Sequence, residues 1–153
     1  MFKAFTTMPH VLLGVWGIVL TVWVIVELIN ANEKSLTRTK NVSLLATILF
    51  WGSYITGGWW YWVYYGGDKA IIKEGAFPAA HGFFMETKEH LFFMIILLSM
   101  LLTIIVKNNN LLENKTFRTL ALTVAIIVVV FGFGMEFFGS MITKGVKIGL
   151  LGL

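Results

Sequence analysis

The sequence predicts an all-α integral membrane protein whose four transmembrane helices form an up-down-up-down bundle. Of its 153 residues, 58% are hydrophobic and 13% are charged, whereas water-soluble domains carry about 25% charged residues. The apolar residues also gather in four windows, each close to the roughly 20 residues that a helix needs to cross the hydrocarbon core of a bilayer. We therefore expect residues 1–153 to form a single membrane domain.

The expected spans are residues 10–31, 42–65, 88–107 and 118–143. We place the start of the first helix at Pro9, because proline is favoured at the first helical position, where its missing N–H would have no partner. Residues 32–41 and 108–117 form short polar loops, and 66–87 form a longer connection rich in glycine. This order puts both termini and the long connection at one end, called the outer end here, and both short loops at the other.

The charge balance indicates which side each end faces. The chain has 12 Lys and Arg against 8 Asp and Glu, a net charge of +4. Because these basic residues flank apolar runs, they favour anionic lipid headgroups over nucleic acid as the partner. They are densest in the short loops, so we predict that these loops are cytoplasmic and that both termini are extracytoplasmic. With no cysteine, the chain has no thiolate ligands, disulfides or iron–sulfur clusters.

Ionisable residues are costly inside a bilayer, about 2.5–3.5 kcal/mol each on insertion scales, so those at the spans mark candidate functional positions. The histidines and several glutamates of the chain all fall at the outer end. These residues are His10, His81, Glu86, Glu89, His90 and Glu136. Helix bundles build metal sites from ligands on facing helices, so this grouping predicts a metal site.

Helical spacing adds detail to this cluster. Glu86 and His90 lie four residues apart and share a helix face. Glu89 points about 60° away in projection and either joins that face or pairs elsewhere. Glu136 is followed by a further apolar run, so we expect it to lie deeper in the membrane than the others.

Glycines accompany the histidine of the first span. His10, Gly14 and Gly17 form one stripe on the helix. Small residues in such a stripe permit either close helix packing or the edge of a planar cofactor. Both interpretations stay open.

Two versions of a redox or electron-transfer function follow. In the first, His10, Glu86, His90 and Glu136 bind a non-haem metal ion, with His81 and Glu89 as further candidates; this mixture suits iron, manganese or zinc better than copper. In the second, His10 and His90 are the axial ligands of haem b, and a lysine such as Lys69 or Lys88 neutralises a propionate. The carboxylates favour the metal ion, and the glycine stripe favours the haem.

Other classes of protein remain as alternatives. A non-catalytic accessory subunit of a larger complex, contacting other membrane subunits or a redox partner, would also be small and lack soluble domains. A transporter is less favoured because no span shows a break. The aromatic run at 59–65 is typical of a membrane-interface belt, and for Glu27, inside the first span, we expect snorkelling or an interhelical hydrogen bond.

Overall fold

A computed structural model describes the backbone of residues 2–152 and the side chains of residues 7–152. In this part of the chain every regular element is a helix and no strand occurs, which confirms the predicted all-α class. Four helical stretches are long and apolar enough to cross a membrane: Thr7–Ile29, Glu33–Glu74, Ala80–Asn108 and Lys115–Leu150. Each overlaps one of the four predicted windows.

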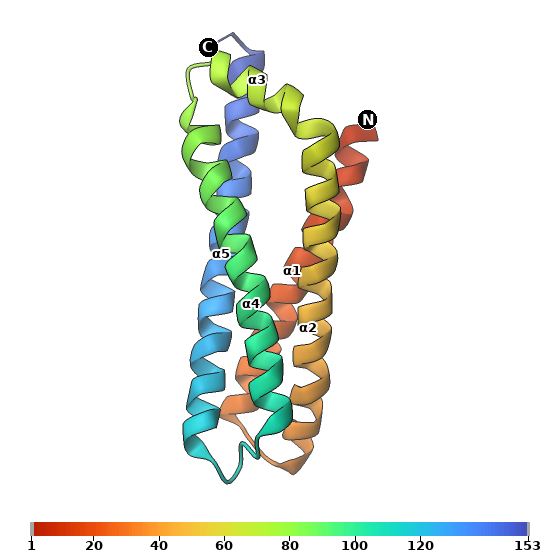
Figure 1. The fold of residues 1–153 in the computed structure, drawn as a ribbon, viewed down its shortest axis with the longest axis vertical. Helices are drawn as coiled ribbons and strands as arrows, with labels where there is room; N and C mark the ends of the chain where they lie inside the picture. The colour runs from red at the N-terminus through yellow and green to blue at the C-terminus, as the bar shows by residue number, and fades with distance from the viewer. Residues whose placement is uncertain (1, 153) are drawn as a thin grey trace.

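The four long helices form an elongated bundle (Figure 1). They are α1 (Phe2–Ile29), α2 (Glu33–Trp60), α4 (Glu86–Asn108) and α5 (Lys115–Leu150). Helix α1 packs against α2 and α5, and α4 packs against the same two helices, so the four form a ring. Both termini lie at one end, called the terminal end below, and the α1–α2 and α4–α5 connections lie at the other, the loop end.

Side-chain caps explain the abrupt turns at the loop end. The side chain of Asn32 accepts a hydrogen bond from the Ser35 amide at 3.0 Å, and the Ser35 hydroxyl accepts one from the Asn32 amide at 2.7 Å. This reciprocal capping box satisfies amides that have no partner within the helix. Asn114 caps α5 in the same way by accepting from the amide of Phe117 at 3.1 Å.

The first helix differs from the prediction. It begins at Phe2, and Pro9 lies inside it, so the prediction that the helix begins at Pro9 is wrong. Proline keeps a φ that is compatible with a helix and costs mainly one backbone hydrogen bond and a clash with the preceding turn. The α1 backbone therefore continues through Pro9 toward the N-terminus.

The long connection predicted over 66–87 is mostly helical. It holds α3 (Gly66–Glu74) and the π-helical segment η2 (Ala80–Met85), and a second π-helical segment, η1 (Tyr61–Tyr65), immediately precedes it. The glycines of α5 explain how it folds back: a Cβ on Gly145 would collide with Ala80, and one on Gly149 would collide with Ile71. Tertiary packing against α5 thus holds a segment helical that its own glycines would weaken.

The apolar core changes along the bundle. At the loop end one continuous cluster joins α1, α4 and α5, and the partly buried Leu36 and Val42 of α2 pack against it. Its buried residues are Val24, Leu28, Leu102, Ile105, Val106, Leu111, Ala121, Val124 and Ala125. A second cluster around Phe50, Ile95 and Val128 continues toward the middle. At the terminal end the buried cluster instead joins the connection to α5, through residues such as Ile72 and Ile142. The four helices enclose a cavity in the terminal half of the bundle.

Candidate functional site

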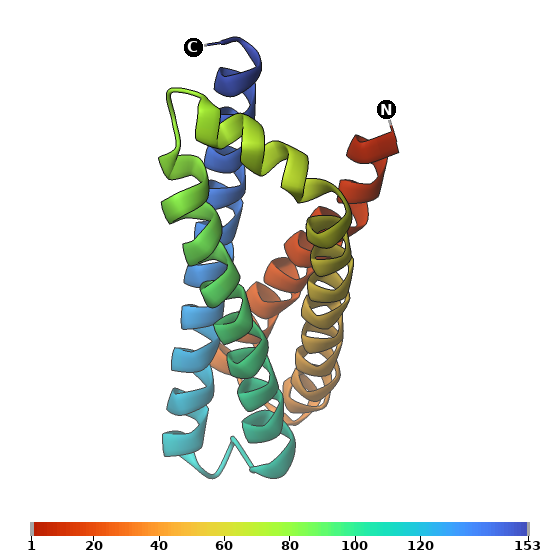
Figure 2. The ribbon, with the colours of Figure 1, turned by 45° about the horizontal axis from the view of Figure 1, so that its top comes forward.

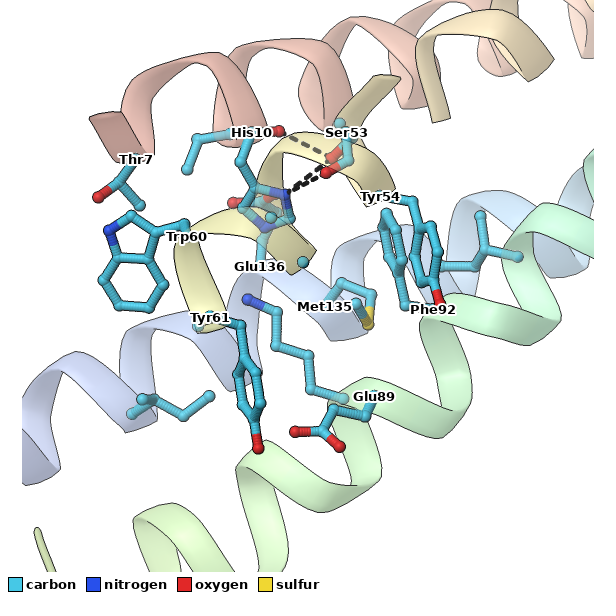
Figure 3. A pocket seen from close by; sticks show the side chains of 18 of the residues that line it. Thr7, His10, Ser53, Tyr54, Trp60, Tyr61, Glu89, Phe92, Met135 and Glu136 are labelled. Atoms are coloured by element: carbon cyan, nitrogen blue, oxygen red, sulfur yellow. Dashed lines mark hydrogen bonds between the residues drawn. The ribbon is translucent and has the colours of Figure 1, made fainter. Parts of the chain in front are cut away.

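The cavity has a volume of about 580 Å³ and is lined by all four long helices. Ligand pockets in proteins usually measure 300–1,000 Å³ and combine apolar walls with a few polar groups. The walls here fit that description, and Figure 3 shows polar side chains from separate helices around one space. The polar side chains that line the cavity include His10, Ser53, Tyr61, Lys88, Glu89 and Glu136.

His10 is the best-defined polar group of the cavity. Its Nδ1 lies 2.8 Å from the backbone oxygen of Ser53 on α2, and the Ser53 hydroxyl donates to the His10 carbonyl at 2.8 Å (Figure 3). A carbonyl oxygen only accepts, so Nδ1 must carry the proton. The second ring nitrogen, Nε2, therefore keeps its lone pair, which can accept a hydrogen bond or bind a metal.

The glycines near His10 have different roles. A Cβ on Gly57 would collide with the His10 ring, so this glycine lets the ring lie against α2. Gly14 lines the cavity, and its Cβ would stand 3.2 Å from the Ser53 hydroxyl. A Cβ on Gly17 would lie 2.7 Å from the Phe50 ring, and Gly17 does not line the cavity. Close helix packing thus accounts for Gly17, whereas Gly14 also borders the space for a ligand.

A charged pair faces His10 from the other helices. The ammonium of Lys88, on α4, lies 3.4 Å from the position that a Cβ on Gly139 of α5 would occupy. Its side chain therefore extends across the cavity, where Glu136 of α5 attracts it electrostatically. Glu89 also lines the cavity, next to Tyr61. The cavity thus contains an imidazole, an ammonium group and two carboxylates.

Two predicted ligands lie elsewhere. Glu86 and His90 share a helix face as predicted, but both are exposed and neither lines the cavity. His90 instead uses Nδ1 to bond the backbone oxygen of Glu86 at 2.7 Å. Sequence periodicity shows which residues share a face but not where that face points. The π-helical segment before α4 further changes the phase of the helix.

His81 lies apart from the cavity too. It is buried in η2, where it forms a hydrogen bond of 3.0 Å with the hydroxyl of Tyr65. Among the described residues, no group of three or more His, Asp or Glu side chains is arranged to hold a metal ion. Of the predicted site residues, the cavity unites His10, Gly14, Glu89 and Glu136.

Sequence reasoning missed some of the polar groups that matter. Ser53 was not considered, although a serine inside an apolar window at the depth of His10 is a signal that could have found it. Lys88 was assigned only a minor role. At the loop end, Glu27 is buried and forms an interhelical hydrogen bond, which confirms one of the two predicted alternatives. Its partner, which the sequence did not identify, is Arg38 of α2, which donates from Nε at 2.9 Å and from Nη2 at 3.1 Å.

Comparisons with known proteins give no direct indication of function. No protein-family model matches the chain, and no match was found among curated proteins or solved structures. The geometry of the cavity is therefore the basis for a functional proposal.

Proposed function

We propose that the chain is an integral membrane protein that binds a redox cofactor in the inter-helix cavity, with b-type haem as the cofactor and His10 as its protein ligand. The observation that carries this proposal is the hydrogen bond from His10 Nδ1 to the Ser53 carbonyl. Histidines that ligate metals usually donate their other N–H to a carbonyl or carboxylate, which fixes the tautomer and the orientation of the ring.

The set of donors in the cavity suits haem. A haem iron receives four nitrogens from the porphyrin and needs only one or two ligands from the protein, and the cavity supplies one imidazole. The volume of about 580 Å³ is on the scale of such a cofactor. Lys88 provides a positive charge for a propionate, and Gly58 lines the cavity with open space beside its Cα. When bound, the haem would supply one-electron redox chemistry.

A non-haem metal ion is the second candidate. It is favoured by one observation, that the carboxylates of Glu89 and Glu136 line the same cavity as His10. Mixed imidazole and carboxylate ligation suits iron, manganese or zinc. This version would require the carboxylates to approach the imidazole more closely than they do in the structure.

An optical spectrum combined with elemental analysis tests both candidates. Protein purified in detergent, incubated with haemin and separated from unbound haemin should show a sharp Soret band that His10→Ala loses. His90→Ala is the matched control, because His90 is exposed and lies outside the cavity, and it should keep the band. If the wild type contains metal but shows no Soret band, and His10→Ala loses that metal, the result would select the non-haem version. An equal spectrum and equal metal content in wild type and His10→Ala would overturn both.

The membrane topology belongs to the same proposal. We propose that α1, α2, α4 and α5 cross the bilayer in alternating directions, with the loop end in the cytoplasm. The absence of cysteine allows a clean test, since one cysteine introduced at Asn110 or at Lys69 can be labelled from a single side. An impermeant thiol reagent added outside should label K69C but not N110C. The reverse pattern would contradict the orientation.

A further inference from the structure

Outside the cavity, the strongest cluster of chemically active side chains joins the two π-helical segments. Tyr65 ends η1 and His81 lies in η2, and the Tyr65 hydroxyl and His81 Nδ1 share a hydrogen bond of 3.0 Å, in which the phenol is the donor when the imidazole proton is on Nε2. π-Helical turns are rare and often occur at functional sites. Here two of them bring a phenol and an imidazole from opposite ends of a connection into direct contact.

The pair is shielded from water. Tyr65 is 1% exposed and His81 is 5% exposed, beneath a cluster that includes Ile72, Ala80 and Ile142. His81 Nδ1 lies within reach of the phenolic proton, because a proton acceptor must lie at about 2.6–3.2 Å from its donor. The hydrogen bond between Tyr65 and His81 is therefore a buried contact and not a polar contact at the protein surface.

An aromatic contact connects the pair with the cavity. The ring of Tyr61 stacks on that of Tyr65, with centroids 4.8 Å apart and planes inclined by 22°. Tyr61 also lines the cavity that contains His10. Two aromatic rings in contact thus connect the cavity with Tyr65.

We infer that Tyr65 and His81 form a one-electron redox site. A one-electron oxidant removes an electron from the Tyr65 phenol, the O–H bond breaks, and the proton moves to His81 Nδ1. The products are a neutral tyrosyl radical, an imidazolium ion and the oxidant reduced by one electron. Return of an electron to the radical and of the proton from His81 restores the pair.

The oxidant is a high-potential one-electron acceptor. In the protein this would be the cavity cofactor oxidised beyond the ferric level by a peroxide, because ferric b-type haem has too low a potential to oxidise a phenol, and this part of the inference rests on the proposed function. The chemistry of the pair itself does not, since any one-electron oxidant of sufficient potential should drive it.

A neighbouring tyrosine provides the matched control. Tyr64 is adjacent in the chain and also contacts the aromatic cluster, with its ring centroid 6.4 Å from that of Trp60. The other two histidines bond elsewhere, His10 with Ser53 and His90 with its own helix. The hydrogen bond from Tyr65 to an imidazole is the property that the comparison isolates.

The test uses the full chain in detergent micelles with a ruthenium tris(bipyridine) photosensitiser and a sacrificial electron acceptor. The readouts are the yield of tyrosyl radical by electron paramagnetic resonance and its rate of formation in H₂O and D₂O. The wild type should form a tyrosyl radical more slowly in D₂O, because the phenolic proton moves with the electron. Tyr65→Phe and His81→Gln should lose more than half of the yield, whereas Tyr64→Phe should retain it.

Glutamine at position 81 can still accept a hydrogen bond but cannot take the proton, which separates a redox role from a purely structural one. Equal radical yields in wild type and His81→Gln, or a wild-type rate that is the same in both solvents, would overturn the inference. The comparison of the wild type with His81→Gln decides even if Tyr65→Phe does not fold, since the chain also contains Tyr54, Tyr61 and Tyr64. Because the photosensitiser supplies the oxidant, failure of haem binding leaves this result unaffected.

Discussion

The two ends of the bundle use the same four helices in opposite ways. At the loop end the helices are packed around a continuous apolar cluster, and Ala121, Ala125 and Val106 are fully buried. Toward the terminal end the α1–α2 pair and the α4–α5 pair diverge (Figure 2), and His10, Lys88 and Glu136 line a cavity. Tight packing at the loop end holds the four helices together, so side chains in the terminal half can line a cavity instead of filling a core.

The helical connection explains how the open half stays apart. Figure 2 shows α3 crossing from the end of α2 toward α5 at the terminal end. Gly145 and Gly149 let this connection lie close against α5. Because a helix is stiffer than an irregular loop, α3 can connect the α1–α2 pair to the α4–α5 pair and also keep the two pairs apart.

The largest expected effect comes from adding volume at the packed end. Ala125 is fully buried, so Ala125→Phe should destabilise the protein by about 1–3 kcal/mol, the usual cost of overpacking a core. The matched substitution in the open half is Gly58→Phe, because a Cβ on Gly58 meets no atom within 4 Å. It should leave stability nearly unchanged while filling part of the cavity and blocking the proposed cofactor. Unfolding in detergent and haem titration measure the two effects.

Equal destabilisation by these two substitutions would contradict the comparison, because the terminal half would then be packed as tightly as the loop half. Haem uptake by a stable Gly58→Phe protein would instead place the cofactor outside the cavity.

The next effect concerns the orientation of His10. Ser53→Ala removes the hydroxyl that donates to the His10 carbonyl and contacts Nδ1 at 3.1 Å. Because Ser53→Ala keeps the backbone carbonyl that accepts from Nδ1, haem affinity should fall by less than the roughly 10- to 100-fold that is typical when a ligand loses its hydrogen-bond partner. Thr39→Ala is the control on the same helix, because its buried hydroxyl donates to the Ser35 carbonyl within α2, near the loop end. Affinities from haem titration should fall for Ser53→Ala alone, and a matching fall for Thr39→Ala would contradict a specific role of Ser53.

The sequence alone predicts much of this fold, since hydropathy and length identify four helices without any tertiary information. It does not predict that 66–87 is largely helical, because the cause is the contact of Ala80 and Ile71 with glycines of α5, far along the chain. The helix propensities of residues 66–87 do not reveal such a contact.

The candidate site is less predictable for a related reason. His10, Glu89 and Glu136 belong to the predicted cluster and line the cavity, yet His90 and Glu86 point away from it. Residue spacing relates side chains on one helix, whereas the rotation of each helix about its axis depends on its neighbours. The partner of Glu27 escaped prediction likewise, since Arg38 belongs to the next helix.

A smaller effect is expected from this ion pair at the loop end. Arg38→Gln removes two hydrogen bonds to the Glu27 carboxylate and leaves the bond from Trp23 Nε1 at 2.9 Å. The melting temperature in detergent should fall by less than in Ala125→Phe, because the Arg38 side chain itself is largely exposed. Arg38→Gln with Glu27→Gln should recover part of the loss, since no buried charge then lacks a partner. A double variant as unstable as Arg38→Gln alone would contradict this account.

The smallest effect tests the hydroxyl contacts that join α2 to α4 in the packed region. The Thr47 hydroxyl donates to the Ser99 carbonyl at 2.9 Å and lies 3.0 Å from the Thr103 hydroxyl. Thr47→Val keeps the shape and removes this link, so it should cost about 0.6 kcal/mol, the average for interhelical hydrogen bonds in membranes. Thr123→Val is the control, because its exposed hydroxyl bonds within α5 to the Thr119 carbonyl. If Thr123→Val loses as much stability as Thr47→Val, the buried interhelical hydrogen bond does not stabilise the protein. The α2–α4 contact would then depend on apolar packing alone.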